Sequence, residues 1–187
     1  MTPGLKAVNP KLMVDINPAG LKNGEQLFRD LYSKPGSPFD YAGIDGYFGS
    51  TQSGGPEEWI PLIDRIYEMT SKPVLINEWG YSSLAGSGVP LNRKVGISVC
   101  ENQAWKLAWR KEHSPEEQAA FVEMGMKIFA TYPHVAGAFF FEWNDNPICP
   151  HCGTKGCPME CGWGLVDSEG RPKPAFYAFK SAAHEYF

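Results

Sequence analysis

The segment Lys72–Gly80, KPVLINEWG, constrains the fold of this chain more than any other part of the sequence. Three consecutive apolar residues, Val74 to Ile76, follow a proline and precede a carboxylate, an aromatic ring and a glycine. An apolar run of this kind is typical of a parallel strand that is covered on both faces. Glu78 then stands at the carboxyl end of the strand, where parallel sheets build their active sites. We therefore expect a catalytic role for Glu78; the alternative is a Glu that caps the next loop or pairs with an arginine.

A second strand is expected over Val135–Asp145, with a Trp, an Asn and acidic residues at its far end. The residues between the two strands read as a helix that begins after Ser114 and stops at Pro133. Ser114 is a good N-cap, and Glu117 completes the sequence signature of a capping box. A strand, a helix and a parallel strand in this order form a βαβ unit.

The rest of the chain repeats this alternation. We expect further strands over Leu12–Asn17 and Phe39–Tyr47, and helices over Gly24–Ser33, Pro56–Thr70 and Pro174–Tyr186. The count is four strands, each followed by a helix, in an α/β fold. The expected apolar faces consist of Leu27, Phe28 and Leu31 in the first of these helices, and of Trp59, Leu62, Ile63 and Ile66 in the second.

Composition fits one globular domain over residues 1–187, because the chain is 43% hydrophobic and can bury a sizeable core. The formal net charge of -4 gives no electrostatic footprint for nucleic acid, which we do not expect as a partner. No apolar stretch approaches the length of a membrane span. The first ten residues lack the apolar core of a signal peptide, so we expect a cytoplasmic protein if Met1 is the true start.

The order of these motifs resembles the C-terminal half of the clan A glycoside hydrolases, retaining enzymes built on a (β/α)8 TIM barrel. Lys72–Gly80 looks like the seventh barrel strand, whose terminal Glu, here Glu78, is the nucleophile. GAFFFEW looks like the eighth strand, with Trp143 as the floor under the sugar. Gly162–Lys180 looks like the ending of many clan members, and Tyr47 stands where many families place a residue that hydrogen-bonds the nucleophile. The resemblance implies four βα units that form half a barrel, strands five to eight.

The resemblance also implies a function. We expect a glycoside hydrolase that acts on β-linked carbohydrate by a retaining mechanism, which needs a second carboxyl group roughly 5 Å from the nucleophile. That acid/base residue is not found, because the clan places it after an Asn and the chain's one Asn-Glu pair is Asn77-Glu78 itself. The alternative is a catalytically impaired half-barrel that serves as a carbohydrate-binding or assembly module. The expected substrate-binding residues are Tyr47, Asn77, Trp79, Trp143 and Asn144.

Half a barrel would leave a strand edge open on each side, which soluble proteins avoid. We therefore expect either a homo-oligomer or a missing N-terminal half-barrel as the partner. The first ten residues, MTPGLKAVNP, read as the end of the helix that precedes strand five.

A cysteine cluster fills the loop 149–161 after the last strand. Four cysteines in the pattern C-x2-C-x4-C-x3-C fit a structural zinc site; two disulfides or an iron–sulfur cluster are the alternatives. Such a zinc would be structural, because four thiolates leave it no open position for catalysis. We expect no cofactor for catalysis. Cys100 is left over as a free thiol, and His151 is expected to be exposed rather than a ligand. The expected zinc ligands are Cys149, Cys152, Cys157 and Cys161.

The connection over residues 84–111 is unusually long, and loops of this length are commonly functional. Trp105 and Trp109 stand about one helical turn apart within it. They could stack on sugars from a short helix, or pack the loop onto the barrel.

Overall fold

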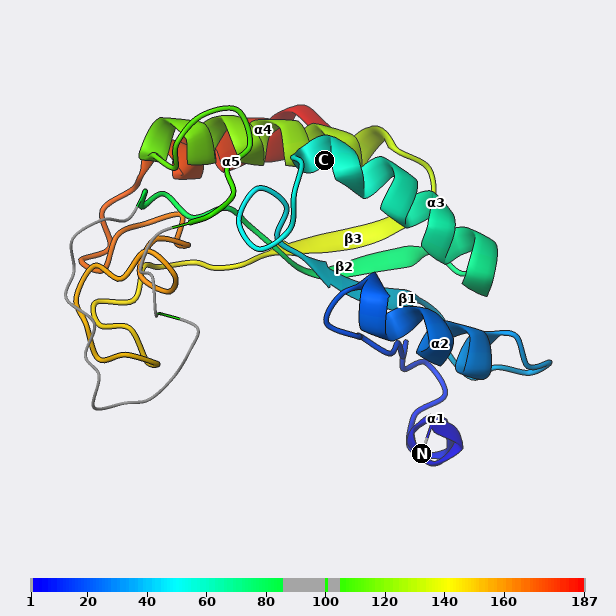
Figure 1. Cartoon of the computed structure of the whole chain (residues 1–187). Helices are drawn as coiled ribbons and strands as arrows, with labels where there is room; N and C mark the ends of the chain where they lie inside the picture. The colour runs from blue at the N-terminus through cyan, green and yellow to red at the C-terminus, as the bar shows by residue number, and fades with distance from the viewer. Residues whose placement is uncertain (1, 86–99, 101–104, 187) are drawn as a thin grey trace. The chain divides into compact units, whose positions relative to one another are not determined.

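A computed structural model describes residues 2–85, 100 and 105–186 of the chain (Figure 1). The described residues fall into two compact units. Unit 1 begins with a short helix, α1 (Thr2–Val8), where the first ten residues predict the end of a helix. Unit 1 comprises the residues up to Gly46, Glu58–Trp79 and Tyr132–Phe139, and unit 2 comprises Tyr47–Glu57, Gly80–Thr131 and the residues from Phe140 on.

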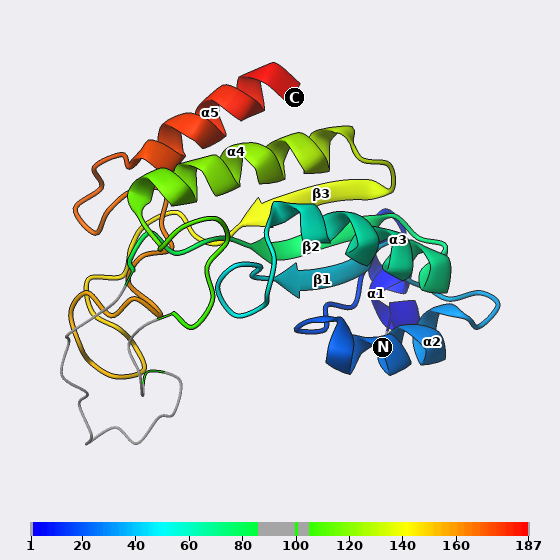
Figure 2. The same ribbon diagram turned by 45° about the horizontal axis from the view of Figure 1, so that its top comes forward.

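Unit 1 is built on a three-stranded sheet in the order β1 (Ala42–Gly46), β2 (Val74–Trp79) and β3 (Val135–Phe140). The three strands point the same way in Figure 2, and β1 pairs with β2 in parallel. Val74 and Ile76 are fully buried, so the strand predicted from their apolar run is confirmed. The fold class is therefore α/β, compatible with part of a TIM barrel.

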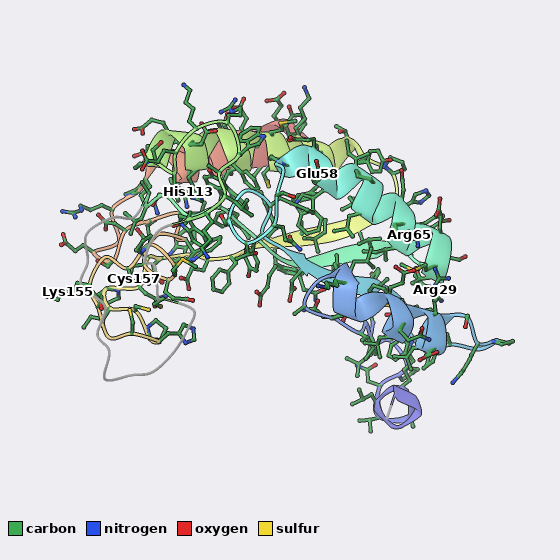
Figure 3. All side chains as sticks on the ribbon, in the orientation of Figure 1. Arg29, Glu58, Arg65, His113, Lys155 and Cys157 are labelled. Atoms are coloured by element: carbon green, nitrogen blue, oxygen red, sulfur yellow. The ribbon has the colours of Figure 1, made fainter. Side chains whose placement is uncertain are left out.

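Two helices complete the interior of unit 1. Helix α2 (Leu21–Tyr32) contacts α3 (Trp59–Thr70), and α3 contacts both β1 and β2. On the surface, the Glu25 carboxylate of α2 accepts hydrogen bonds from Arg29 at 2.7 Å and from Arg65 of α3 at 2.9 Å (Figure 3). The predicted apolar face of α3 is confirmed for Trp59, Ile63 and Ile66, which are fully buried, whereas Leu62 is half-buried.

The predicted apolar face of α2 is partly wrong. Leu27 is 38% exposed and Leu31 is half-buried, although Phe28 is fully buried as expected. Tyr32 takes the second interior position instead, one turn after Phe28. Residues four apart share one helix face, so Gly24, Phe28 and Tyr32 form the buried stripe of α2. The helix also begins three residues earlier than predicted.

The strand predicted over residues 12–17 is wrong, because no strand forms there. The Val14 amide donates to the Asp40 carboxylate at 2.8 Å, and the Ile16 amide donates to the Tyr32 hydroxyl at 3.2 Å. Side chains thus occupy the donors that a strand ladder would use. Burial raises the pKa of Tyr32 to about 12. The described residues therefore contain three strands rather than the four of the predicted half-barrel.

Unit 2 contains the helices α4 (Pro115–Thr131) and α5 (Pro174–Tyr186), which lie side by side (Figures 1 and 2). The Ser114 hydroxyl accepts a hydrogen bond from the Glu117 amide at 3.1 Å, which confirms the predicted N-cap. The Glu117 carboxylate turns instead to Arg110, whose backbone and guanidinium nitrogens donate to it at 3.2 Å. Only half of the predicted capping box is therefore observed.

Most of unit 2 outside these helices is irregular. Strand β3 ends at Phe140, before the predicted end at Asp145. Trp143 therefore lies in the loop after the strand rather than on a face of the sheet. Isolated bridges from Val166 to Asn144 and to Pro172 connect the loop after β3 with the segment before α5. Among the described helices, none combines the length and apolarity needed to cross a membrane.

Candidate active site and cysteine cluster

The candidate active site of unit 1 is the carboxyl end of its sheet, where Glu78 of β2 pairs in register with Asp45 of β1. The register runs from Ile44 opposite Ile76 directly to Asp45 opposite Glu78, which leaves Asn77 as the extra residue of a bulge. Simple alternation would put Glu78 on the face of the fully buried Ile76. The bulge returns Glu78 to the face of Asp45, because paired residues project to the same side of a sheet.

Further polar side chains surround this pair. A Cβ atom at Gly43 would collide with the Asp15 carboxylate and the Asn77 side-chain oxygen, so only glycine fits between them. The Asn17 amide donates a hydrogen bond to Asp45 Oδ1 at 2.9 Å. One face of unit 1 therefore carries three acidic side chains and two amides at the strand ends; we call Asp15, Asn17, Asp45, Asn77 and Glu78 the carboxylate face.

Crowding of negative charge perturbs the carboxylate face. Burial raises the pKa of Asp45, and the nearby charges of Glu78 and Asp15 raise it further. The hydrogen bond from Asn17 acts in the opposite direction but does not cancel these effects. Asp45 thus stays protonated to a higher pH than an exposed aspartate. Perturbed carboxyl groups of this kind cluster at functional sites.

Two buried oxygens of the carboxylate face have no hydrogen-bond partner within the part of the chain that the structure describes. They are Asp15 Oδ2 and Asn77 Oδ1. Buried acceptors are rarely left unpaired in folded proteins, so each of these oxygens has room for one more donor, such as an internal water. They lie at the end of the sheet where Glu78 is predicted to act.

Aromatic side chains gather in unit 2. The ring of Tyr47 lies 5.0 Å from that of Trp163 and 5.9 Å from that of Phe141, both edge to face. The Trp163 indole nitrogen donates to the Met159 carbonyl at 2.7 Å, which fixes its ring. Sequence reasoning selected Tyr47 and missed its two ring partners. Its predicted role beside Glu78 stays a prediction.

The other predicted sugar contacts differ in exposure. Trp143 is 62% exposed, and its ring lies 6.0 Å from that of Phe176, edge to face. Asn144 is also exposed, so both side chains are open to a ligand, and their roles stay predictions. Trp79 is fully buried, so its ring has no surface to offer a sugar, and we do not retain it as a contact. Its place in the apolar interior explains why an aromatic residue follows Glu78.

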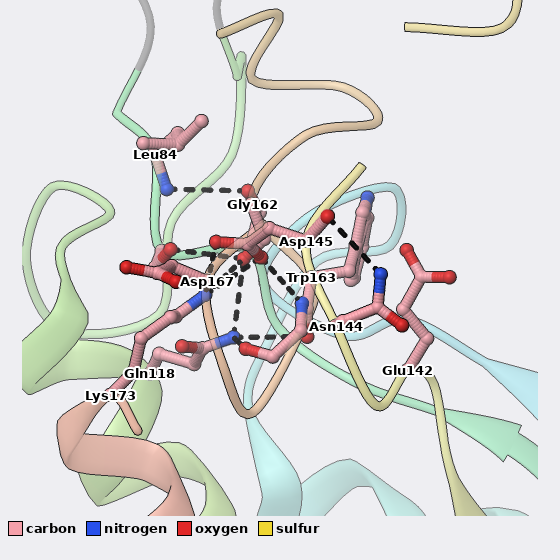
Figure 4. Close-up of polar contacts among 12 residues, drawn as sticks. Leu84, Gln118, Glu142, Asn144, Asp145, Gly162, Trp163, Asp167 and Lys173 are labelled. Atoms are coloured by element: carbon pink, nitrogen blue, oxygen red, sulfur yellow. Dashed lines mark hydrogen bonds and ion pairs between the residues drawn. The ribbon is translucent and has the colours of Figure 1, made fainter. Parts of the chain in front are cut away.

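A buried polar network fixes the loop that carries Trp143 (Figure 4). Lys173 Nζ donates to both carboxylate oxygens of Asp145, at 2.9 and 3.1 Å, and the Gly164 amide donates to Oδ1 at 2.7 Å. The Gln118 side-chain nitrogen lies 2.8 to 3.2 Å from four backbone carbonyls, those of Tyr81 and residues 162–164. Burial raises the pKa of Asp145 and lowers that of Lys173, while the contact between the two opposes both shifts.

All five cysteines are free and buried in one cluster of unit 2, which shows no disulfide (Figure 3, around Cys157). The sulfurs of Cys100, Cys149, Cys152 and Cys157 all lie within 4.8 Å of one another, close enough to hold a metal ion. Cys161 belongs to the cluster but lies outside this group of four. This group differs from the predicted ligand set in one member, with Cys100 in place of Cys161, and the ligand set stays a prediction. His151 lies 3.4 Å from Glu160 and is not in the group.

Burial and crowding perturb the pKa values of these thiols. Burial and the neighbouring thiols raise the pKa of Cys100, and burial raises that of Cys157 to about 12. For Cys152, burial acts upward, but hydrogen bonds with Thr154, Cys149 and Cys100 together outweigh it and lower the pKa to about 7. A metal ion that binds here would displace the protons of the thiols that remain protonated at neutral pH.

The predicted long connection is described only at Leu84 and residue 85, at Cys100 and from Trp105 on; residues 86–99 and 101–104 lie outside the described residues. No helix forms over residues 105–111. The Trp105 ring lies 5.1 Å from that of His113, and the Trp109 ring 5.7 Å from that of Phe121. These contacts support the packing interpretation of the two tryptophans over a sugar platform.

Sequence reasoning missed Asp15, Asn17 and Asp45 on the carboxylate face and Cys100 in the cysteine cluster. A polar residue at the end of each strand-like segment, in LMVDIN and AGIDGY, is the signal that could have found the first three. For Cys100 the sequence offers no signal, because 49 positions separate it from Cys149.

No family model and no curated protein matches this sequence. Solved structures do match in fold. A GH2 β-galacturonidase from Eisenbergiella tayi, solved with galacturonate, aligns over 100% of this chain and 30% of its own, with 17% identity and a TM-score of 0.65. A β-glucuronidase from Bacteroides uniformis aligns over 97% of this chain and 19% of its own, with 16% identity and a TM-score of 0.64.

A GH128 endo-β-1,3-glucanase from Amycolatopsis mediterranei, solved with laminaritriose and laminaribiose, also matches. The alignment covers 96% of this chain and 61% of that one, with 16% identity and a TM-score of 0.60. At these identities the likeness shows the fold. This chain spans between 19% and 61% of the length of the three glycoside hydrolases whose fold it shares in part.

Proposed function

We propose that this chain is the nucleophile-bearing part of a retaining glycoside hydrolase that acts on β-linked carbohydrate, with Glu78 as the nucleophile. The observation that carries the proposal is the bulge in β2, which turns Glu78 toward Asp45 at the carboxyl end of a parallel sheet. The partial fold shared with GH2 and GH128 glycoside hydrolases supports the same reading.

In the proposed reaction, a Glu78 carboxylate oxygen bonds to the anomeric carbon while the bond to the leaving oxygen breaks. A general acid protonates that leaving oxygen. In the second step the same group, now ionised, removes a proton from a water molecule, whose oxygen attacks the anomeric carbon and releases the sugar from Glu78. Asp45 does not suit this second role. It stands beside Glu78 on the neighbouring strand, whereas the two catalytic carboxyl groups of glycosidases flank the bond that breaks.

We assign a positioning role to Asp45. Asp45 pairs in register with Glu78 and accepts a hydrogen bond from the Asn17 amide, which suits it to hold Glu78 in place. Asp15 Oδ2 and Asn77 Oδ1 are buried, so these two oxygens offer no surface to a sugar, and binding by Asn77 stays a prediction. Three acidic side chains on one face repel a sugar carboxylate, so we expect a neutral sugar to bind better than a uronate.

We propose that the acid/base carboxyl group comes from a further half-barrel, either in the same protein or in a second copy. Support comes from the matched glycoside hydrolases, of which this chain spans 19% to 61%. In addition, β3 has only β2 as a neighbour in the described sheet, and Phe139 on it is 61% exposed. A further strand paired along that edge would extend the sheet and cover this ring.

We further infer that the four-cysteine group holds zinc and that the metal is structural. Four thiolates complete a tetrahedral shell and leave no open position for water or substrate. The zinc would staple the loop after β3, which also carries Trp143, and it would take no part in the chemistry.

Hydrolysis of aryl β-glycosides tests the proposed function. Activated aryl leaving groups need no protonation, so they report on the nucleophile even where the acid is absent. We expect Glu78→Gln to lower kcat/KM by at least about a thousandfold, and Glu78→Ala to yield an α-glycosyl azide when azide is added. Glucosides and galactosides should react faster than glucuronides. Sugar binding without turnover of any activated glycoside would contradict the proposal and favour a binding module.

A further inference from the structure

The cysteine cluster offers five thiols for four ligand positions, so a metal must leave one of them out. Spacing in the sequence favours the four cysteines of residues 149–161, which stand within one short loop. The structure provides a different choice, because Cys100 is fully buried in the same cluster. Two observations separate Cys100 from Cys161, and a third concerns the turn that holds Cys149 and Cys152.

The first observation is the spacing of the sulfurs. Cys100 Sγ lies 3.7 Å from Cys149 Sγ and 3.8 Å from Cys157 Sγ. Four sulfurs about 2.3 Å from a central zinc, at the corners of a tetrahedron, stand about 3.8 Å from one another. The two measured distances therefore match two edges of a zinc tetrahedron. An iron–sulfur cluster binds its thiolates through separate iron atoms and needs a wider cage.

The second observation concerns Cys161. Its sulfur lies outside the group of four and donates a hydrogen bond to the Thr154 carbonyl at 3.9 Å. Cys157 Sγ contacts Cys100 Sγ inside the group, whereas Cys161 Sγ turns to a backbone oxygen. The geometry therefore places Cys161 at the side of the site.

The third observation is the turn that follows Cys149. The Cys152 amide donates to Cys149 Sγ at 3.4 Å, and Gly153 adopts a positive φ of 69°. Amide donors directed at sulfur stabilise a thiolate, and glycine allows the backbone to turn in this way. Cys149 and Cys152 therefore form one half of the site, which needs two more thiolates.

We infer that the ligands of the proposed zinc centre are Cys100, Cys149, Cys152 and Cys157, and that Cys161 is not a ligand. This inference rests on the proposed zinc centre and adds the identity of its fourth ligand. The metal then links the segment that contains Cys100 to the loop after β3, a separation of 49 positions along the chain. Zinc would act as a cross-link between distant segments rather than as a clip within one loop.

X-ray absorption at the zinc edge, with metal analysis of the full chain purified under reducing conditions, tests the ligand set. Wild-type protein should contain one zinc with four sulfurs at about 2.3 Å. Cys161→Ser should keep one zinc and four sulfurs. Cys100→His should keep zinc with three sulfurs and one nitrogen, which shows replacement of a ligand in a folded protein. Cys100→Ser should reduce the sulfur count or lose the metal.

Four sulfurs in Cys100→His, or three in Cys161→Ser, would overturn the ligand set while leaving the zinc centre itself intact. Absence of metal from the wild-type chain, with five thiols that react in denaturant without prior reduction, would refute the zinc centre and the inference with it. A coloured wild-type protein that contains iron would do the same. Loss of the ligand set or of the zinc centre would not bear on the proposed role of Glu78, which lies in the other unit.

Discussion

The interiors of the two units are stabilised by different interactions. Unit 1 buries apolar side chains against a sheet, and Trp59, Ile44 and Ile76 are fully buried. Unit 2 buries the polar side chains of Lys173 and Gln118 near backbone carbonyls, and it also buries five thiols. Apolar burial is non-directional and tolerates small shifts, whereas buried polar groups require partners in fixed positions. Unit 2 also buries apolar side chains such as Phe121, Val122 and Trp163, so specific polar bonds order its loops in addition to apolar packing.

The difference also bears on function. On the carboxylate face, Asp45, Asn77 and Glu78 lie at the ends of paired strands, so their geometry follows from sheet register. The residues of unit 2 that are open to a ligand, Trp143 and Asn144, lie in a loop held by the Asp145–Lys173 pair. Loops positioned by a fixed framework commonly carry binding residues. Damage to the network should therefore disturb this loop of unit 2, while damage to the apolar interior of unit 1 should disturb the carboxylate face.

The largest expected effect comes from breaking the buried ion pair. Asp145→Ala leaves Lys173 buried without its partner, and we expect a loss of about 3–5 kcal/mol in the free energy of unfolding. Urea titration measures the loss. The double variant Asp145→Leu with Lys173→Met removes both charges and should recover much of the stability. A loss below about 1 kcal/mol would show that the network does not order unit 2.

A cavity in the apolar interior of unit 1 should lower the free energy of unfolding. Ile76→Ala removes a fully buried side chain and should cost about 2–4 kcal/mol in urea titration. Leu27→Ala is the matched control, because Leu27 is 38% exposed and should cost less than about 1 kcal/mol. Equal costs at the two positions would mean that the apolar interior is not where the structure places it.

Glu117 should support unit 2 at neutral pH. Arg110 lowers its pKa against the effect of burial, so the ionised form stabilises the fold above the unfolded-state pKa of about 4.3. That contribution is lost as the pH falls through the lowered folded-state pKa. We expect Glu117→Gln to cost about 1–2 kcal/mol at pH 7 and nothing at pH 2. A cost that is independent of pH would contradict the assigned charge.

Asp45 on the carboxylate face should behave in the opposite way. Its pKa is raised by burial and by Glu78, so ionised Asp45 destabilises the fold at neutral pH. The penalty grows as the pH rises from the unfolded-state pKa of about 3.9 to the higher folded-state value. Asp45→Asn should therefore gain about 0.5–1 kcal/mol at pH 7 and nothing at pH 3. Thermal melts of the variant at both pH values test this prediction. A variant less stable than the wild type at pH 7 would be inconsistent with the raised pKa of Asp45.

Local patterns in the sequence predict much of the fold. The apolar run before Glu78 predicts β2, and Pro174 to Tyr186 is observed as helix α5 over the predicted range. The strand expected over residues 12–17 fails because its amides bind the Asp40 carboxylate and the Tyr32 hydroxyl, which are distant in sequence. No local pattern encodes those two partners.

The candidate site, like the fold, is only partly predictable from local sequence patterns. Strand-end position predicts where Glu78 stands in β2, but the bulge at Asn77 and the partner Asp45 depend on pairing between strands. Motif spacing predicts a metal-binding loop from Cys149 on, yet Cys100 enters it through tertiary structure. Register and long-range packing are properties of the folded chain, and they decide which predicted residues meet.

Covalent labelling tests the role of Glu78 most directly. A 2,4-dinitrophenyl 2-deoxy-2-fluoro-β-glycoside needs no general acid for its first step and accumulates as the glycosyl-enzyme, so the test holds where the acid/base residue lies outside this chain. Incubation with the gluco, galacto and glucurono forms, followed by peptide mass analysis, should add one sugar to the peptide that contains Glu78. Asp45→Asn should retain the label, and Glu78→Gln should lose it. A label on another carboxylate, or none with any of the three sugars, would contradict the account.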